Sequence, residues 1–226
     1  MKQKFIDNLA LVRRRIAIAC QRVGRQIDEI QIVAVTKNYP ASVIEIATAE
    51  ELRNIGENRI KEAEDKFASI TKTATYHLIG HLQSNKAKKA VALFDVIQSV
   101  DSLKLARIID REAEKLNRIM ECYLQVNCSH EEQKFGANPQ DCLEILKEIL
   151  ALKNLNLTGL MTMGPFTDNE KEIRESFKLC HKLFKESKAL IGDSFCNLSM
   201  GMSGDFEIAI EEGSTMIRIG SALFAS

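Results

Sequence analysis

Short apolar runs rich in β-branched residues alternate with longer amphipathic stretches along this chain. This alternation is typical of βαβ units, in which helices connect parallel strands. Runs that are apolar at successive residues, such as 32–35, indicate strands that are buried on both faces. The pattern predicts eight strands, over residues 31–37, 54–58, 75–81, 95–100, 121–127, 157–163, 195–200 and 216–220.

The helical pattern is clearest at residues 102–116, and a further helix is predicted over about 5–23, before the first strand. In 102–116 the apolar residues form one stripe at helical spacing, which would face a sheet: Leu103, Leu105, Ala106, Ile109, Ala113 and Leu116. Eight strand–helix units with an extra leading helix predict a single (β/α)8 barrel domain over residues 1–226. A doubly wound open sheet would give much the same pattern, so it stays open at this point.

The composition is that of an ordinary globular protein, with 45% hydrophobic and 27% charged residues. The 31 basic and 31 acidic side chains cancel, so no net field attracts nucleic acid or an anionic membrane. The N-terminus lacks a signal-peptide pattern, and no segment reaches the length of a membrane span. We therefore expect a cytoplasmic protein whose scattered cysteines are reduced and mostly buried: Cys20, Cys122, Cys128, Cys142, Cys180 and Cys196.

Residues at the carboxyl ends of the strands carry the chemistry of a parallel barrel, because these ends meet at one mouth. The residues that end the predicted strands, or follow them directly, are Thr36, Lys37, Glu57, Asn58, His81, Asn127, Met163, Gly164, Ser199, Ser203, Arg218, Gly220 and Ser221. A lysine, an asparagine, a histidine, an arginine and two glycine-containing loops are thus expected to converge.

Lys37 follows an apolar run, so its amine would be partly desolvated where the barrel interior meets the mouth. Desolvation favours the neutral amine that forms an imine with a carbonyl compound. The alternative is a lysine that ends a strand and extends into water without a chemical role.

Two loops indicate an anion site. Gly201, Ser203 and Gly204 precede an amphipathic stretch, and Gly220 and Ser221 follow the eighth predicted strand. The loops after strands 7 and 8 are the recurrent phosphate site of this fold, because backbone N–H groups converge there. Alternatively, Ser203 only caps the helix that follows it.

Arg218 lies within an apolar strand, where an unpaired guanidinium would be costly. It therefore needs a partner, which is either an acid such as Glu207 or Glu211 or the ring nitrogen of a bound cofactor. An arginine at that nitrogen would keep the ring unprotonated and weaken it as an electron sink.

His77 and His81 are four residues apart on a predicted strand and would face the same side. No cysteine or carboxylate stands at ligand spacing, so we predict no metal site. The basic stretch 81–90 fits a solvated helix face better than an anion site. A nucleic-acid or scaffold function would rest on residues 85–89 alone.

These motifs resemble those of the pyridoxal-phosphate homeostasis proteins across almost the whole chain. The matching segments are AVTKNYP (34–40), IGENR (55–59), HLIGHLQSNK (77–86), KFG (134–136), LMTMGP (160–165) and LSMGMSGDFEIAIEEGSTMIRIGSALF (198–224). Asn38 is a small departure, because the family often has threonine or a similar residue there.

The resemblance implies that the chain binds pyridoxal 5′-phosphate (PLP) as an imine on Lys37. It also implies that Ser203 and the backbone at Gly220 and Ser221 bind the phosphate, and that Asn58 lies close to the ring. Arg218 would face the pyridine nitrogen or, alternatively, reach the phosphate.

The family is similar in turn to the N-terminal barrel of alanine racemases, which supports the barrel prediction. Racemisation in that fold uses a second acid/base, a tyrosine from a separate domain, and two bases on opposite faces serve inversion at Cα. This chain ends soon after the eighth strand, and its tyrosines are Tyr39, Tyr76 and Tyr123. The resemblance thus implies a non-enzymatic PLP carrier, with apo forms of PLP-dependent enzymes as candidate partners. A PLP-dependent racemase of low activity is the alternative. The sequence leaves the oligomeric state open, and we expect a monomer.

Overall fold

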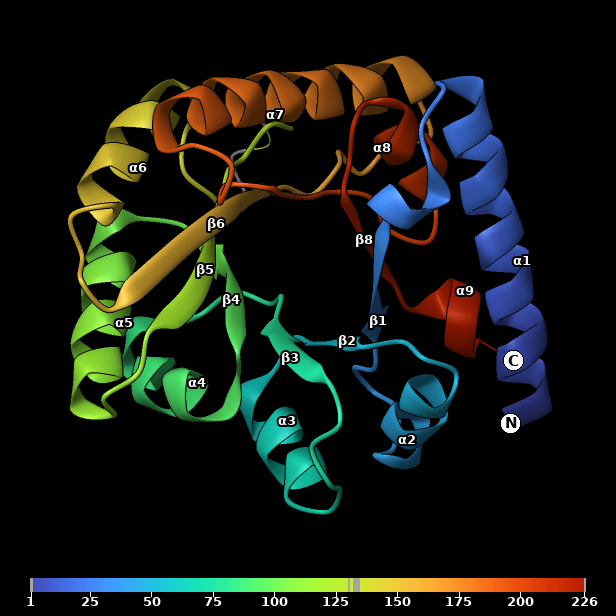
Figure 1. The fold of residues 1–226 in the computed structure, drawn as a ribbon, viewed down its shortest axis with the longest axis horizontal. Coiled ribbons are helices and arrows are strands. Elements are labelled where there is room, and N and C mark those ends of the chain that lie inside the picture. Colours follow the sequence, from blue (N-terminus) through green and yellow to red (C-terminus); the bar gives the residue numbers. More distant parts are fainter. Residues whose placement is uncertain (1, 130, 132–134, 226) are drawn as a thin grey trace.

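The computed structural model describes residues 2–129, 131 and 135–225. Within these ranges, eight parallel strands close into a barrel in chain order, with β8 paired to β1 (Figure 1). The barrel prediction is confirmed and the open-sheet alternative is wrong. The strands are β1 (Gln31–Val35), β2 (Asn54–Glu57), β3 (Thr75–Leu78), β4 (Val96–Val100), β5 (Met120–Gln125), β6 (Leu155–Met161), β7 (Asn197–Ser199) and β8 (Met216–Ile219).

Helices surround the barrel (Figure 1). The predicted helix at 102–116 is α5, where the Ser102 hydroxyl caps the first turn by accepting from the Leu105 N–H. Leu116 follows the helix and is 45% exposed, so it lies outside the buried stripe. The described helices are α1 (Lys2–Arg22), α2 (Ser42–Ala49), α3 (Ile60–Phe67), α4 (Ala87–Leu93), α5 (Leu103–Lys115), α6 (Cys142–Ile149), α7 (Glu170–Ile191), α8 (Phe206–Glu211) and α9 (Ser221–Phe224).

Several strands end earlier than predicted. β3 ends at Leu78 and not at residue 81, and β2 ends at Glu57, so Asn58 already lies in the loop. Apolar character follows burial, and burial continues beyond the last residue that pairs with a neighbouring strand. The prediction that His77 and His81 share one side of a strand is therefore wrong, because His81 lies past the end of β3.

Side chains alternate between two apolar layers along each strand. The inner layer fills the barrel and consists of Val33, Val96, Tyr123, Met161 and Met216, with the partly buried Met163 packed against it. The outer layer is much larger and joins the strands to the helices. Inner residues near the carboxyl ends of the strands therefore face the mouth of the barrel.

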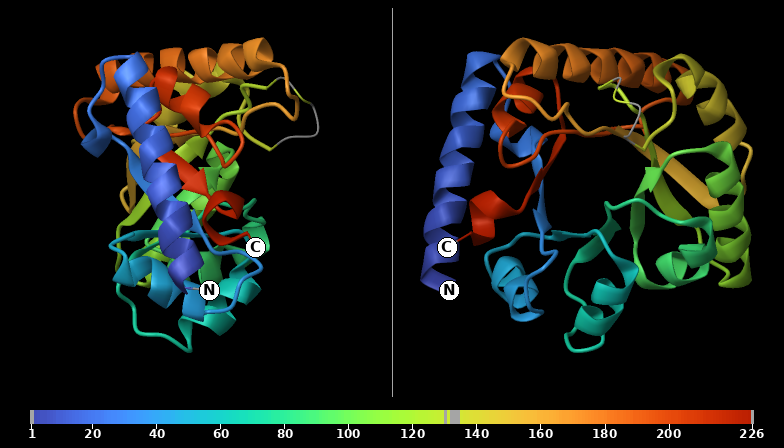
Figure 2. Two further views of the ribbon diagram at one scale, coloured as in Figure 1. Left: turned by 90° about the vertical axis from the view of Figure 1, so that its right-hand side faces the viewer. Right: turned by 180° about the vertical axis from the view of Figure 1, so that it is seen from behind.

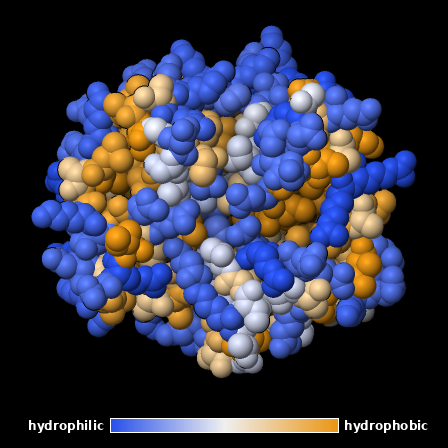
Figure 3. Space-filling model, in the orientation of Figure 1, coloured by the Kyte–Doolittle hydropathy of each residue, from blue (hydrophilic) through white to orange (hydrophobic). Residues whose placement is uncertain are grey.

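Helix α1 packs along the outside of the barrel beside α8 and α9 (Figure 2). Its buried residues recur every three or four positions, as an amphipathic helix requires: Phe5, Leu9, Val12, Ile16, Ala19 and Cys20. Polar residues are spread over the face shown in Figure 3, with apolar patches between them. Among the described helices, none combines the length and the apolar character needed to cross a bilayer.

Candidate functional site

A cavity of about 370 Å³ opens at the carboxyl ends of the strands. All six residues predicted to bind the cofactor lie in its wall, although they come from four separate loops and strand ends. The lining residues are Val35, Lys37, Asn58, Ile79, Met163, Met202, Ser203, Gly204, Arg218, Gly220 and Ser221. His81 and Asn127, which were expected at the same mouth, are not among these lining residues.

The two-residue period of the strands explains this convergence. Val33 fills the barrel and Val35, two residues further on, lines the cavity, so both lie on the inner face of β1. Lys37 lies beyond the end of the strand and lines the cavity as well. Arg218 and Gly220 continue the inner face of β8 in the same way. Residues of the cavity wall can therefore be recognised in the sequence, because they follow inward-facing strand residues at steps of two.

Lys37 is exposed and occupies a turn two residues past the end of β1. The desolvation that we expected for its amine is therefore not found. The backbone on both sides of it is fixed, however. Thr36 is fully buried, and Asn38 has a left-handed backbone with φ of 64°. Asparagine tolerates this conformation better than a β-branched residue, so the departure from the family pattern has a local reason.

Lys66, on α3, fixes the backbone around Lys37. Its buried Nζ donates to the Thr36 carbonyl at 2.7 Å, to Glu57 Oε1 at 2.8 Å and to Glu62 Oε1 at 2.6 Å. Glu62 also accepts a hydrogen bond from the Asn38 N–H, so both neighbours of Lys37 are bonded to one charged cluster. We did not predict this cluster, because nothing in the spacing of these residues pairs α3 with the end of β1.

Glu57 is the buried acid of the cluster and is fully enclosed. It accepts from the Thr36 hydroxyl at 2.6 Å, while its Oε2 has no hydrogen-bond partner in the described residues. Burial raises the pKa of Glu57, although the hydrogen bonds from Lys66 and Thr36 oppose this shift. The carboxylate therefore depends on Lys66 for its charge balance.

Arg218 is buried, and carbonyl oxygens hold its guanidinium. Nη1 donates to the Ser199 carbonyl at 2.8 Å and to the Ser199 hydroxyl at 2.7 Å, and Nη2 donates to the Thr162 carbonyl at 2.8 Å. Burial lowers the pKa of Arg218 to about 10, which leaves it charged at neutral pH. The guanidinium is thus fixed in the cavity wall.

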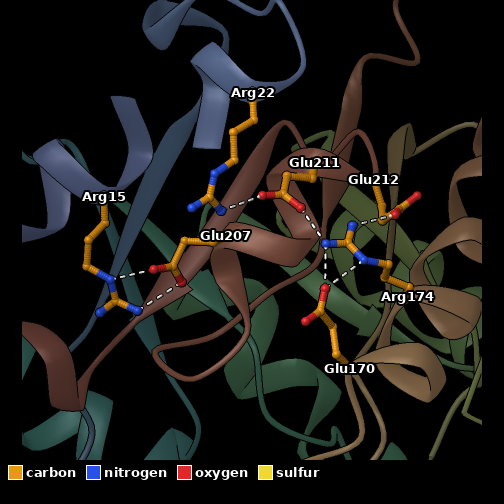
Figure 4. Close-up of polar contacts among 7 residues, drawn as sticks. All are labelled: Arg15, Arg22, Glu170, Arg174, Glu207, Glu211 and Glu212. Atoms are coloured by element: carbon orange, nitrogen blue, oxygen red, sulfur yellow. Dashed lines mark hydrogen bonds and ion pairs between the residues drawn. The ribbon is translucent and has the colours of Figure 1, made fainter. Parts of the chain in front are cut away.

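Arg218 forms no salt bridge with Glu207 or Glu211, so these two acids are not its partners. Figure 4 shows both acids on the outside of the barrel, where Glu207 pairs with Arg15 of α1 and Glu211 pairs with Arg22 and with Arg174 of α7. The reason is geometric: Arg218 lies on the inner face of β8, while α8 packs on the outside.

The loops after β7 and β8 are joined by Ser203. Its Oγ accepts from the Gly220 N–H at 3.3 Å and from the Ala222 N–H at 3.2 Å. Ser203 therefore does not cap α8, the helix that follows it. Its oxygen instead accepts from two N–H groups at the start of the short helix α9, and these two hydrogen bonds use both of its lone pairs. The hydroxyl hydrogen remains available to donate, because no described residue accepts from it.

The backbone of Asn58 packs closely against Gly80. A Cβ at Gly80 would lie 2.2 Å from the Asn58 carbonyl oxygen, so only glycine permits this approach of the two loops. Asn58 also lines a neighbouring depression of about 440 Å³ with His81, Lys86 and Lys89. In the basic stretch 81–90, Lys89 forms an ion pair with Glu64 on the surface.

The two histidines have separate surroundings. His77 is buried inside the barrel between Asn54 and Gln98, and burial lowers its pKa to about 4. His81 pairs with Asp101 at 3.3 Å and stacks on Phe135. Across residues 2–129, 131 and 135–225, no group of three histidine, cysteine, aspartate or glutamate side chains is placed to hold a metal ion.

Within the described ranges the cysteines are mostly buried, as predicted, and Cys196 alone is exposed. Of the KFG motif, Lys134 lies outside the described residues.

A sequence model of the family described as "Alanine racemase, N-terminal domain" matches residues 8–226. The pyridoxal phosphate homeostasis protein of Aquifex aeolicus is 36% identical over 219 residues, which cover 96% of each chain. The chain belongs to the pyridoxal phosphate homeostasis protein family. A solved structure of PipY of Synechococcus elongatus PCC7942, with PLP bound, is 37% identical to this family member. That match covers 95% of this chain and 100% of PipY, with a TM-score of 0.81.

The likeness to alanine racemase is one of fold. The enzyme of Clostridium difficile 630 superposes with a TM-score of 0.76 at 15% identity, over 95% of this chain and 60% of the enzyme. The family member therefore has the barrel of that enzyme's N-terminal part.

Proposed function

We propose that this chain binds PLP in the cavity at the barrel mouth and holds it as a Schiff base on Lys37, as part of PLP homeostasis. One observation supports the proposal most strongly. The same cavity is lined by the amine of Lys37, the fixed guanidinium of Arg218 and the hydroxyl of Ser203, which lies beside backbone amides. A volume of about 370 Å³ falls in the usual range for small-molecule sites. PipY, whose solved structure has PLP bound, supports the choice of ligand.

The donor set fits the functional groups of PLP. Lys37 supplies the amine for the aldehyde, and Ser203 can donate its hydroxyl hydrogen to the phosphate beside the backbone of Gly220 and Ser221. Asn58 would lie next to the ring. When bound, PLP supplies an electron sink whose strength depends on the protonation of its ring nitrogen. A charged Arg218 facing that nitrogen would keep it unprotonated.

The cavity favours a carrier over a racemase. Among its described lining residues, Lys37 and Arg218 are the only ionisable side chains. Tyr123 is part of the barrel core, Tyr76 stacks on Phe67, and Tyr39 packs on Phe224. No lining residue therefore offers a second acid/base opposite Lys37. We propose that the bound PLP is passed to apo forms of PLP-dependent enzymes.

Racemase activity is expected to be very low even at saturating PLP. The test incubates L-alanine with the PLP-loaded protein in heavy water, measuring D-alanine by chiral chromatography and Cα deuterium by mass spectrometry. Lys37 alone permits slow exchange at Cα, without efficient inversion. Turnover on the order of 1 s⁻¹ or more, within the usual enzyme range, would overturn the carrier function and favour the racemase.

Ser203→Ala is expected to weaken PLP binding by roughly 1.5–3 kcal/mol, the contribution of one hydrogen bond to a charged group. Pyridoxal lacks the phosphate, so its affinity should be nearly unchanged. Titrations of both ligands by absorbance provide the comparison. An equal loss of affinity for PLP and for pyridoxal would show that Ser203 does not bind the phosphate. Tighter binding of PLP would indicate that the phosphate binds the N–H groups of Gly220 and Ala222, which the substitution frees from Ser203.

A further inference from the structure

A chain of hydrogen bonds crosses the barrel interior below the cavity. It begins at Arg218, whose Nη1 donates to the Ser199 hydroxyl at 2.7 Å, and Ser199 donates to Gln98 Oε1 at 2.7 Å. Gln98 Nε2 lies 2.9 Å from His77 Nδ1, and His77 Nε2 lies 3.1 Å from Asn54 Oδ1. The chain thus links β8 and β7 to β4, β3 and β2, across the barrel in Figure 1.

Every bond in this chain has the same direction. An amide nitrogen only donates, so His77 Nδ1 must accept from Gln98, and His77 Nε2 must carry the hydrogen that it donates to Asn54. Asn54 Nδ2 then donates to Gln31 Oε1 at 3.3 Å, where the chain reaches the surface. Arg218 cannot accept a hydrogen bond, so it fixes the direction from its end of the chain.

The surroundings keep this arrangement in one state. Arg218, Ser199, Gln98 and His77 are all at least 96% buried, so water does not compete for these bonds. Burial also lowers the pKa of His77 to about 4, so its ring is neutral at neutral pH and Nδ1 stays an acceptor. A hydrogen on Nδ1 would oppose the Gln98 amide and require it to turn over.

We propose that Ser199, Gln98 and His77 are positioning residues that fix the orientation of the Arg218 guanidinium in the cavity wall. The part of this inference that concerns the ring nitrogen of PLP rests on the proposed function. The part that concerns Arg218 itself does not rest on the proposed function, because every hydrogen bond from Arg218 to Asn54 forms within the protein without a ligand. Losing the Ser199 hydroxyl removes one of three hydrogen bonds to the guanidinium, while the bonds to the carbonyls of Ser199 and Thr162 remain. Losing Gln98 leaves the Ser199 hydroxyl without its buried acceptor, and either change loosens the guanidinium.

The first experiment measures rotation of the Arg218 guanidinium by ¹⁵N NMR in the protein without PLP. Ser199→Ala removes one hydrogen bond to the guanidinium and should speed rotation about tenfold, the effect of losing one hydrogen bond of moderate strength. Gln98→Met breaks the hydrogen-bond chain one link further away and should speed rotation by a smaller factor, because the bond from Arg218 to the Ser199 hydroxyl remains. Ser214→Ala is the matched control, because its buried hydroxyl contacts the carbonyls of Leu198, Met200 and Met216 and lies outside the chain. Equal rotation in all four proteins would overturn the inference.

The ¹⁵N spectrum of His77 gives a second readout, in which the wild-type ring should carry its hydrogen on Nε2. A hydrogen on Nδ1 would contradict the direction of the chain. With PLP labelled at its ring nitrogen, the resonance of the bound ligand should move in Ser199→Ala and Gln98→Met but not in Ser214→Ala. Failure of the wild type to bind PLP at all would overturn the proposed function alone, since the Arg218 measurement does not use the ligand.

Discussion

Lys37→Ala is expected to abolish the imine absorbance that PLP gives with the wild-type protein. Lys37 is the only lysine among the described residues that line the cavity, so no other lysine of its wall can replace it. PLP should still bind weakly through contacts to its phosphate and ring. The measurement is an absorbance titration of the purified variant with PLP, followed by dialysis to determine how much ligand is retained.

Lys86→Ala is the matched control for this experiment. Lys86 lies in the neighbouring depression, which shares Asn58 with the cavity, so it is an alternative attachment point for the cofactor. The control should keep the full imine band. Loss of the band in Lys86→Ala together with its retention in Lys37→Ala would move the attachment point to the second depression.

Lys66→Met is expected to lower the free energy of unfolding by about 3–5 kcal/mol at neutral pH, because it leaves a buried carboxylate without its counter-ion. Glu57 loses both the hydrogen bond and the charge that oppose the effect of burial, so its pKa rises further above the value in the unfolded chain. A raised carboxyl pKa gives stability that is present at acid pH and is lost as the pH rises through the folded-state value. The difference from wild type should therefore shrink towards acid pH. Denaturant unfolding at several pH values measures it.

Two further variants separate the ion pair from the packing of Lys66. Glu57→Gln combined with Lys66→Met removes both charges, and it should recover most of the lost stability. Lys61→Met removes a lysine of the same helix whose ion pair with Asp65 is exposed, and it should change stability by about 0.5 kcal/mol or less. A loss of similar size in the single and double variants, with no dependence on pH, would contradict the account of Glu57.

The barrel and the wall of the cavity could be predicted because both depend on local periodicity. Val33 and Val35 share a face of their strand whatever the rest of the chain does, and apolar runs alternate with amphipathic stretches in every unit. The two loops that we propose for the phosphate were predicted in the same way, from glycine and serine placed after predicted strands. Exact strand ends were missed, because burial extends further along the chain than backbone pairing does.

Contacts between distant segments could not be predicted from spacing. For Arg218 the sequence left an acid or a ring nitrogen open as the partner, yet its hydrogen bonds go to the Ser199 hydroxyl and to the carbonyls of Thr162 and Ser199, and every residue type possesses a carbonyl. Nothing in the sequence indicated that Lys66 is bonded to the backbone beside Lys37. Both contacts have one cause: the partners are set by packing between elements, which leaves no periodic trace in the sequence.

The most direct test of the central claim is to locate the cofactor on the chain. The purified protein is loaded with PLP, reduced with borohydride and digested, and the pyridoxyl group is mapped by mass spectrometry. We predict that the group is found on Lys37. A pyridoxyl group on Lys86 or Lys88, or no stable adduct after reduction, would contradict the proposal that this family member holds PLP on the lysine at the end of β1.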